Sequence, residues 1–302
     1  MSKIAVIDIG TNSTRLLVAG IDQGKIIPFY TDLITTRLGQ GIEGGVLLPE
    51  AIARTSEAIA KLKNKALEWN VSSIVAVGTS AVRDAANKEL FLDEVYKKAG
   101  LSVRVLSGKE EAFYSYTGVS GEFGKLDSAL IVDIGGGSTE FTWKEQDKII
   151  CRSVNAGAVR MTEGGHGDRK IIEIMKKTLD EINICRPETL IGVGGTVTTL
   201  AAMEMSLDSY DRSLVHGYRL SLSSVSGHLE KLVNTGPEDR KNIPGLQPAR
   251  ADVIVAGVRI LMLVMTALRY DKVIVSEADL MYGLAFEKIK IVDKNITTHN
   301  QN

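Results

Sequence analysis

Short apolar runs rich in β-branched residues open each half of the chain, and longer stretches of helical period follow them. In the first half these runs predict three consecutive strands, at 3–9, 15–19 and 25–30. The second half repeats the pattern, with strands predicted at 130–133, 139–143 and 148–154. A helix and a further strand follow each set, at 49–70 and 73–78 and again at 169–183 and 190–193. The chain is therefore expected to be an α/β protein built from two halves of one architecture.

The segment Gly118–Asp127 carries glycines and charges but few large apolar residues, which indicates a domain boundary. We expect an N-terminal domain at 1–122 and a C-terminal domain at 123–283, with the last helix, about 284–302, packing back on the first domain. The stretch Val253–Leu268 is strongly apolar, yet it contains Arg259 and is too short to span a bilayer, so it predicts a buried helix.

One motif occurs at the end of the first strand in each half. The copies are Ile7-Asp8-Ile9-Gly10-Thr11-Asn12-Ser13-Thr14 and Val132-Asp133-Ile134-Gly135-Gly136-Gly137-Ser138-Thr139-Glu140. Glycines let backbone N–H groups approach a phosphate, and the hydroxyls add donors without charge. The aspartates Asp8 and Asp133 are suited to hold Mg²⁺, which takes oxygen ligands and usually binds together with substrate phosphates. A single copy could be an ordinary turn after a strand, but the repetition predicts a duplicated phosphate site.

Two further segments carry polar turns. The hydroxyl-rich turn Thr79-Ser80-Ala81-Val82-Arg83-Asp84 follows a strand and opens a helix, so Arg83 is a candidate anion ligand, with a surface ion pair to Asp84 as the alternative. Ser107-Gly108-Lys109-Glu110-Glu111 begins another helix with two adjacent carboxylates. A third glycine-rich turn, Gly192–Thr196, does not have the glycine spacing of a dinucleotide fingerprint.

Composition narrows the choice of partners. The chain has 302 residues and a formal net charge of −1, so no basic field predicts nucleic-acid binding, and any phosphate affinity must be local. Cys151 and Cys185 have no metal-ligand spacing, and no signal segment precedes the first strand, so a cytoplasmic protein without a membrane anchor is expected. The sequence leaves a homodimer open.

At these motifs the chain resembles the exopolyphosphatase / guanosine pentaphosphate phosphohydrolase family, which belongs to the superfamily of actin, sugar kinases and heat-shock chaperone ATPases. The resemblance covers nearly the whole chain and includes Asp8–Ser13, Arg37–Gly39, Thr79–Ala85, Ser107–Ala112, Asp133–Glu140, Gly157–Arg160, Gly194–Thr196, Val215–Gly217 and Arg250–Ile254. It implies two actin-like (ribonuclease H-like) domains with an active-site cleft between them.

The resemblance also implies roles for individual residues. Glu111 would be the base that activates water, with its neighbour Glu110 as the competing choice from sequence. The implied metal ligands are Asp133 and Glu140, joined by Asp8 from the first loop, for Mg²⁺ or Mn²⁺. The implied phosphate ligands are Gly10, Thr11, Asn12, Ser13, Arg83, Gly136, Gly137 and Ser138.

The expected activity is release of terminal phosphate from inorganic polyphosphate, from guanosine pentaphosphate, or from both, which would connect the protein with the stringent response. The alternative is a non-catalytic regulator that binds polyphosphate or an alarmone. One motif departs from the family, because Asp279-Leu280-Met281-Tyr282-Gly283 stands where Gly-Leu-Arg-Glu-Gly is usual. Longer relatives add helical domains that extend the polyphosphate groove, so short polyphosphates are the favoured substrates here.

Overall fold

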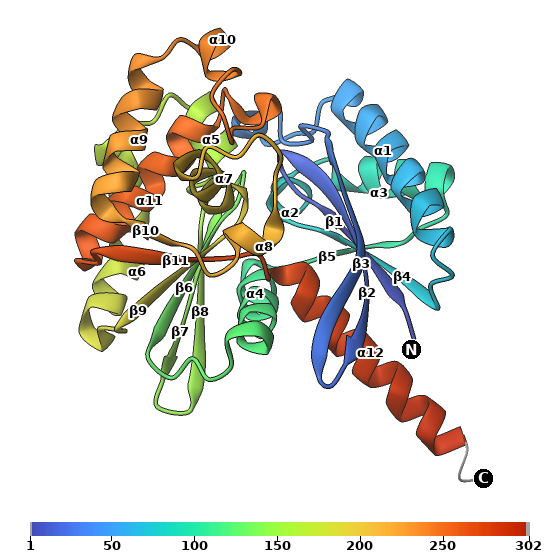
Figure 1. Cartoon of the computed structure of the whole chain (residues 1–302). Helices are drawn as coiled ribbons and strands as arrows, with labels where there is room; N and C mark the ends of the chain where they lie inside the picture. Colours follow the sequence, from blue (N-terminus) through green and yellow to red (C-terminus); the bar gives the residue numbers. More distant parts are fainter. Residues whose placement is uncertain (1, 300–302) are drawn as a thin grey trace. The chain divides into compact units, whose positions relative to one another are not determined.

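The computed structural model describes residues 2–299, and their side chains up to Ile289 (Figure 1). The chain divides into two compact units. Unit 1 contains the chain up to Lys125 together with the segment from Ala278 onward, and unit 2 is Leu126–Glu277. Residues 278–283 therefore belong to unit 1, whereas the sequence placed them in the second domain. The cleft expected between the domains stays a prediction.

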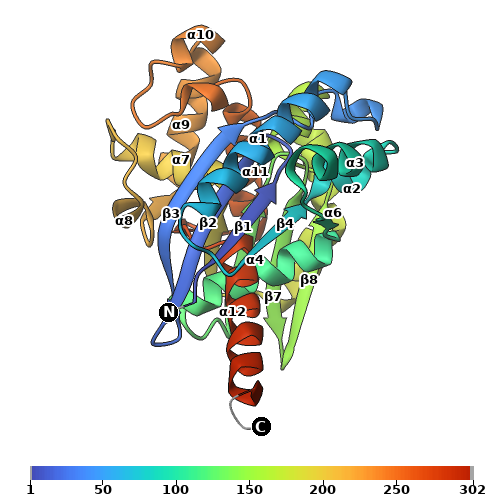
Figure 2. The ribbon, with the colours of Figure 1, turned by 90° about the vertical axis from the view of Figure 1, so that its right-hand side faces the viewer.

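Unit 1 contains a five-stranded sheet in the order β3-β2-β1-β4-β5. The first three strands are antiparallel neighbours, as the predicted meander requires, whereas β1 pairs with β4 and β4 with β5 in parallel. The strands are β1 (Ile4–Ile9), β2 (Ser13–Asp22), β3 (Lys25–Thr35), β4 (Ser73–Gly78) and β5 (Val103–Val105). In Figure 2, helix α1 (Pro49–Leu67) crosses in front of β1 to β3.

Alternation along β1 builds a core on each face of this sheet, because successive side chains point to opposite faces. Ala5, Ile7 and Ile9 pack with α1 and with α3 (Lys88–Ala99). Ile4 and Val6 pack on the other face with the start of α12 (Leu280–His299). Burial of each large aliphatic side chain contributes about 1.5–3 kcal/mol. These contacts explain why the returning segment joins unit 1.

Unit 2 contains a six-stranded sheet in the order β10-β11-β9-β6-β7-β8. The run β8-β7-β6-β9-β11 repeats the order and pairing directions of β3-β2-β1-β4-β5, and β10 adds one antiparallel strand. The strands are β6 (Ala129–Ile134), β7 (Thr139–Glu145), β8 (Lys148–Val154), β9 (Thr189–Val193), β10 (Arg219–Ser221) and β11 (Lys272–Ser276). The prediction of an α/β fold with two actin-like domains is confirmed, with a mixed sheet in each unit.

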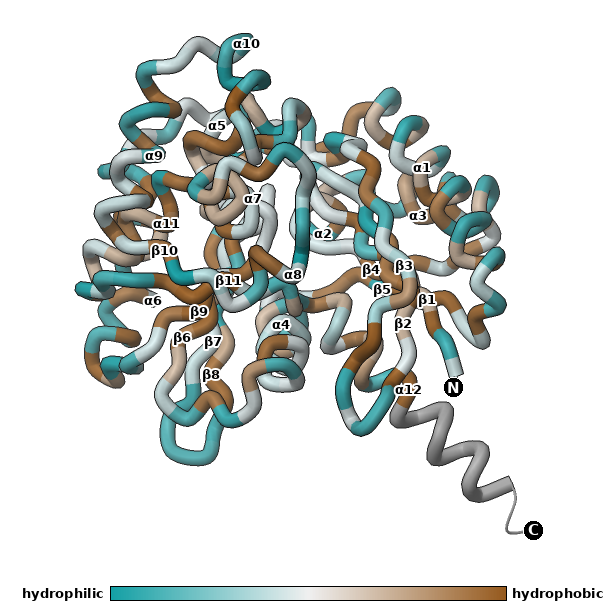
Figure 3. The backbone as a smooth tube through the Cα atoms, in the orientation of Figure 1, coloured by the Kyte–Doolittle hydropathy of each residue, from teal (hydrophilic) through white to brown (hydrophobic). Residues whose placement is uncertain are grey.

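In the large hydrophobic core of unit 2, residues of β6 and β9 pack with the apolar helix α11 (Ile254–Leu268). Figure 3 shows these segments as largely hydrophobic and the turn between β7 and β8 as hydrophilic. The burial predicted for the apolar stretch is confirmed, and no helix among residues 2–299 is long and apolar enough to cross a membrane. The other helices of unit 2 are α5 (Ala158–Glu163), α6 (Asp168–Cys185), α7 (Gly195–Glu204), α8 (Arg212–Val215), α9 (Leu222–Asn234), α10 (Pro237–Arg240) and the 3₁₀ turn η2 (Pro248–Arg250).

The interpretation of Gly118–Asp127 as a boundary segment is only partly right, because helix α4 (Gly108–Phe123) continues through its first glycines. These glycines allow two helices to approach closely. A Cβ on Gly118 would lie 2.2 Å from the carbonyl oxygen of Asp279, and one on Gly283 would lie 2.1 Å from that of Tyr114. The contact between α4 and α12 lies within unit 1, whose remaining short elements are α2 (Ser80–Asp84) and the 3₁₀ turn η1 (Ile42–Gly44).

Candidate functional site

The two aspartate–glycine loops have the same backbone geometry. The N–H of Gly10 donates to the carbonyl of Ser13 over 3.0 Å, and that of Gly135 donates to the carbonyl of Ser138 over the same distance. A Cβ on either glycine would lie about 3 Å from that carbonyl oxygen, at 2.9 and 3.1 Å. Each turn therefore closes only around a glycine, and the sequence duplication is a structural one.

A segment that follows the third strand of each unit is hydrogen-bonded to the loop. In unit 1, the N–H groups of Thr36 and Arg37 donate to the carbonyl of Asn12 (3.1 and 2.8 Å), and the N–H of Gly39 donates to that of Thr11 (2.8 Å). We call residues 36–39 the unit 1 overlay segment. A Cβ on Gly39 would lie 2.1 Å from the Cγ2 of Thr11, so glycine is required there.

The corresponding segment of unit 2 is residues 157–160. The N–H groups of Ala158 and Val159 donate to the carbonyls of Gly135 (2.9 Å) and Gly136 (2.8 Å). The guanidinium of Arg160 donates through Nε to the carbonyl of Gly137 over 2.8 Å. These hydrogen bonds occupy carbonyls of both loops, so a phosphate site of the predicted kind would use the remaining N–H groups and hydroxyls.

The residue opposite the loop aspartate differs between the units. In unit 1, Arg15 stands opposite Asp8 in the β1–β2 register and donates to its Oδ2 through NH2 (2.6 Å) and Nε (3.0 Å). Arg15 also donates through NH1 to Asp279 over 2.5 Å. Burial raises the pKa of Asp8, and the charge of Arg15 opposes that shift. Asp8 is 3% exposed, and it shares the guanidinium of Arg15 with Asp279.

In unit 2 the residue opposite Asp133 is another acid, Glu140. Opposed residues of antiparallel strands have Cβ atoms roughly 4.5–5.5 Å apart, so two carboxylates here repel each other unless a cation joins them. Glu140 is 4% exposed and accepts a 2.7 Å hydrogen bond from Ser153. The third glycine-rich turn lies against the same aspartate, since a Cβ on Gly194 would lie 2.9 Å from Asp133 Oδ1.

These residues fit a magnesium ion of the predicted kind. Mg²⁺ usually takes one or two carboxylates and completes its shell with water and substrate phosphates. Asp133 and Glu140 supply two carboxylate ligands. Residues 2–289 contain no group of three or more histidine, cysteine, aspartate or glutamate side chains that could hold a metal. A metal role for Asp8 stays a prediction, and its buried Oδ1, which has no hydrogen-bond partner, is the atom that would serve it.

The contacts at the start of α4 distinguish the two candidate bases, Glu110 and Glu111. Ser107 is the N-cap, and Glu110 completes a capping box by accepting from the Ser107 N–H and hydroxyl, each at 2.8 Å. Glu110 also accepts from Arg104 over 2.5 Å, and these donors lower its pKa to about 2. Its side chain is 40% exposed. Glu110 is thus engaged in capping the helix.

Glu111 has different surroundings. It is 6% exposed and forms an ion pair with the NH1 of Arg83. Arg83 also donates to the Leu106 carbonyl (3.2 Å) and pairs with Asp84 (3.3 Å), as the ion-pair alternative expects, and its role as a phosphate ligand stays a prediction. A buried carboxylate that is paired with a cation and not used by the helix cap is the better candidate for a base. Its catalytic role stays a prediction.

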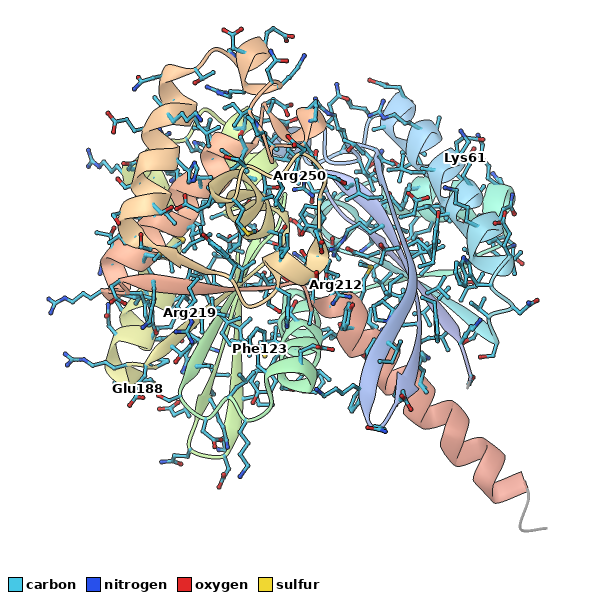
Figure 4. All side chains as sticks on the ribbon, in the orientation of Figure 1. Lys61, Phe123, Glu188, Arg212, Arg219 and Arg250 are labelled. Carbon is cyan, nitrogen blue, oxygen red and sulfur yellow. The ribbon has the colours of Figure 1, made fainter. Side chains whose placement is uncertain are left out.

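Several residues near these loops were not identified from the sequence. Arg15, the partner of Asp8, could have been predicted from the sequence, because the register of a short hairpin places the two residues opposite each other. Asp279 was noticed only as a departure from the family pattern, and its ion pair joins positions 264 apart in the sequence. Arg250, labelled in Figure 4, lies against the third glycine turn, because a Cβ on Gly195 would lie 2.1 Å from its NH1. Lys61, by contrast, projects from α1 and is 65% exposed.

Comparison with known proteins agrees with this geometry. The sequence pattern of the Ppx/GppA phosphatase family matches residues 17–291. The chain belongs to this family. Exopolyphosphatase 2 of Mycobacterium tuberculosis is 32% identical over 94% of this chain and 98% of its own length. The guanosine-5′-triphosphate,3′-diphosphate pyrophosphatase of Vibrio atlanticus is 29% identical over 94% of this chain, which corresponds to 59% of that longer protein.

Two solved structures are similar to nearly the whole chain. An exopolyphosphatase from Cytophaga hutchinsonii has a TM-score of 0.88 at 28% identity, covering 96% of this chain and 98% of that one. The PPX-GPPA enzyme of Aquifex aeolicus has a TM-score of 0.77 at 31% identity, with coverages of 95% and 99%. The resemblance inferred from the motifs is therefore confirmed.

Proposed function

We propose that this protein is a Mg²⁺-dependent phosphohydrolase that releases terminal phosphate from inorganic polyphosphate, from guanosine pentaphosphate, or from both. The observation that carries the proposal is the carboxylate of Glu111, which is buried and paired with Arg83. It occurs in a chain with two glycine loops whose carbonyls accept hydrogen bonds. Hydrolysis of a phosphoanhydride needs a positioned water, and a carboxylate can orient that water and accept its proton. A protein that only binds its ligand has no need of such a base.

Each residue of the candidate site has a proposed role. Glu111 accepts the proton of the attacking water, and the guanidinium of Arg83 orients that carboxylate. N–H groups and hydroxyls of Gly10–Ser13 and of Gly136–Ser138 bind phosphate oxygens. Asp133 and Glu140 would hold Mg²⁺, which, when bound, neutralises charge that develops on the phosphoryl oxygens.

Polyphosphate is the favoured substrate. The Mycobacterium relative named an exopolyphosphatase matches this chain over 98% of its own length, whereas the Vibrio pyrophosphatase is a longer protein of which the chain covers 59%. Guanosine pentaphosphate remains the second substrate of the proposal. We also propose a cytoplasmic location, where both compounds would be encountered.

A side-by-side assay of phosphate release tests the proposal. Tripolyphosphate, long-chain polyphosphate and guanosine pentaphosphate are compared in the presence of Mg²⁺, each with and without ATP, and Glu111→Gln serves as the matched inactive control. We expect phosphate release from at least one substrate by the wild type and none by the variant. Tight binding of polyphosphate or the guanosine compound without phosphate release would favour a non-catalytic regulator instead. Release that requires ATP would favour a kinase-like activity.

A further inference from the structure

Arg15 donates twice to the same oxygen of Asp8. Its Nε and NH2 both contact Oδ2, at 3.0 and 2.6 Å. An arginine and a carboxylate that pair alone favour two parallel hydrogen bonds, one to each carboxylate oxygen. Here the other oxygen, Oδ1, is buried, and no donor from the described residues reaches it. An unpaired buried acceptor costs about 1–3 kcal/mol, so the surroundings enforce this arrangement.

The carboxylate of Asp279 accounts for the position of the guanidinium. Its Oδ2 accepts a hydrogen bond from the NH1 of Arg15 over 2.5 Å, so the third nitrogen is bound to a second acid. Its Oδ1 accepts from the N–H of Met281 over 2.9 Å, which places Asp279 as a cap before α12. Asp279 is 5% exposed. The pull on NH1 therefore comes from a buried carboxylate that is itself held at a helix start.

The backbone of Asp279 is also fixed. Its carbonyl accepts from the N–H of Gly283 over 3.2 Å and lies against α4, where a Cβ on Gly118 would approach it to 2.2 Å. Asp279 is the second residue of the segment with which the chain returns to unit 1. In the motif usual for the family this position is glycine, which has no side chain to bind an arginine. The arrangement is therefore a property of this chain.

We propose that Asp279 is a positioning residue. By holding Arg15 at NH1, it keeps Oδ1 of Asp8 available to a hydrogen-bond donor or cation that binds together with the phosphate substrate. Asp8 lies in β1, immediately before the loop that is proposed to bind phosphate, and this inference rests on that proposed function. Without the charge of Asp279, the guanidinium can pair with both oxygens of Asp8, and Oδ1 is then occupied by the protein itself.

The test is Asp279→Asn. Asparagine caps a helix about as well as aspartate, so the start of α12 is kept while the charge that holds Arg15 is lost. We expect KM for tripolyphosphate to rise by about 10- to 100-fold while kcat changes little, since Glu111 is untouched. An unchanged KM would overturn the proposal. A lower KM would overturn it too, because it would mean that Asp279 only repels the polyanion.

Arg15→Lys tests whether the effect of Asp279 passes through Arg15. A lysine keeps the charge, but its single ammonium lacks the fork that spans two carboxylates. This variant should itself raise KM for tripolyphosphate, and adding Asp279→Asn to it should change KM little further. A double variant whose loss equals the product of the two single losses would show that Asp279 acts independently of Arg15 and would reject the proposed role.

Asp211→Asn is the matched control, because Asp211 also precedes a helix and accepts from the N–H two residues later, that of Ser213, over 2.8 Å. It should leave KM unchanged. Calorimetric binding of tripolyphosphate to Glu111→Gln, with and without Asp279→Asn, separates this inference from the proposed function. Weaker binding supports the role of Asp279 even if the wild type releases no phosphate. Equal affinities reject that role even if the wild type is a hydrolase.

The same titrations in Mg²⁺ and in excess chelator distinguish the two kinds of group that Oδ1 would accept. A loss of affinity confined to the Mg²⁺ solutions supports the proposal with a metal ion at Oδ1. A loss of the same size in chelator supports it with a hydrogen-bond donor. No loss in either solution overturns it.

Discussion

Substituting the adjacent carboxylates Glu110 and Glu111 one at a time separates an effect on folding stability from an effect on catalysis. Each is replaced by glutamine, which keeps the shape of the side chain but cannot accept a proton. Glu111→Gln should lower kcat by about 10²- to 10⁴-fold, the usual effect of removing a general base, which corresponds to about 2.7–5.4 kcal/mol of transition-state stabilisation. Substrate binding should stay nearly intact, since the proposed phosphate contacts lie in the two loops, Gly10–Ser13 and Gly136–Ser138.

Glu110→Gln should affect stability and leave turnover near normal. The carboxylate accepts two hydrogen bonds from Ser107 and one from Arg104, but its side chain is 40% exposed, so solvent screens much of their strength. We expect a loss of about 0.5–2 kcal/mol, the range measured for helix N-caps. A shift in Tm of about 1–8 °C follows, at roughly 2–4 °C per kcal/mol for a domain of this size.

The assay is phosphate release from tripolyphosphate at 25 °C, with far-UV circular dichroism to show that both variants are folded. Glu111→Gln also removes the partner of Arg83, which keeps its contacts with Leu106 and Asp84. A modest fall in the Tm of Glu111→Gln is therefore compatible with the assignment of Glu111 as the base. An inactive Glu110→Gln beside a near-normal Glu111→Gln would show that the assignment is reversed, and near-normal activity of both would place the base elsewhere.

Four further outcomes are expected. Activity should require a divalent metal and vanish in excess chelator, and Asp133→Asn should raise the Mg²⁺ concentration needed for half-maximal rate by at least about 10-fold; full activity in chelator would refute the metal site. Because the folded-state pKa of Glu110 is lowered from 4.5 to about 2, its stabilisation is present above pH 4.5 and lost as pH falls through 2, so Tm curves of wild type and Glu110→Gln should converge in that window. KM for polyphosphate should rise steeply with salt but become flat beyond a short chain length; continued tightening to hundreds of phosphates would mean that a longer binding groove exists. Gly157→Ala places a Cβ 2.5 Å from the backbone of Gly136 and should destabilise the protein by about 1–3 kcal/mol, whereas Gly121→Ala, in open space within α4, should stabilise it by about 0.5–1 kcal/mol.

Much of the fold could be predicted from short-range sequence patterns. The apolar runs, the Asp-Gly turns and the helical periods each depend on neighbours within a few residues, so the strands of both meanders and α11 were found from the sequence. Gly118 of α4 was misread because its reason is tertiary, since it makes room for Asp279 and for Tyr282 of α12. The assignment of 278–283 failed for the same reason.

The candidate site was predictable in its loops but not in the partners of its charged residues. A glycine turn after an aspartate is visible in a single stretch of sequence, whereas the ion pair between Arg83 and Glu111 joins two separate segments. The choice between Glu110 and Glu111 depended on which carboxylate closes the capping box; the spacing of Ser107 and Glu110 carries that signal in the sequence, and the hydrogen bonds at Ser107 show it in the structure. The left-handed backbone of Arg37 has no signal in residue type, because arginine does not favour that conformation.

The two loops share a backbone but differ in charge, and that difference indicates how they divide the binding of a polyanion. Asp8 has Arg15 opposite it, and the same guanidinium pairs with Asp279, so one cation stands beside two carboxylates at this loop. Asp133 has Glu140 opposite it, with Cβ atoms roughly 4.5–5.5 Å apart, so two ionised carboxylates here would repel each other. A divalent cation would relieve that repulsion, and we expect phosphate to bind the unit 2 loop more tightly when the metal is present. One duplicated hairpin thus carries an acid paired with an arginine in unit 1 and two opposed acids in unit 2, and the proposed dependence on metal should therefore be stronger at the unit 2 loop.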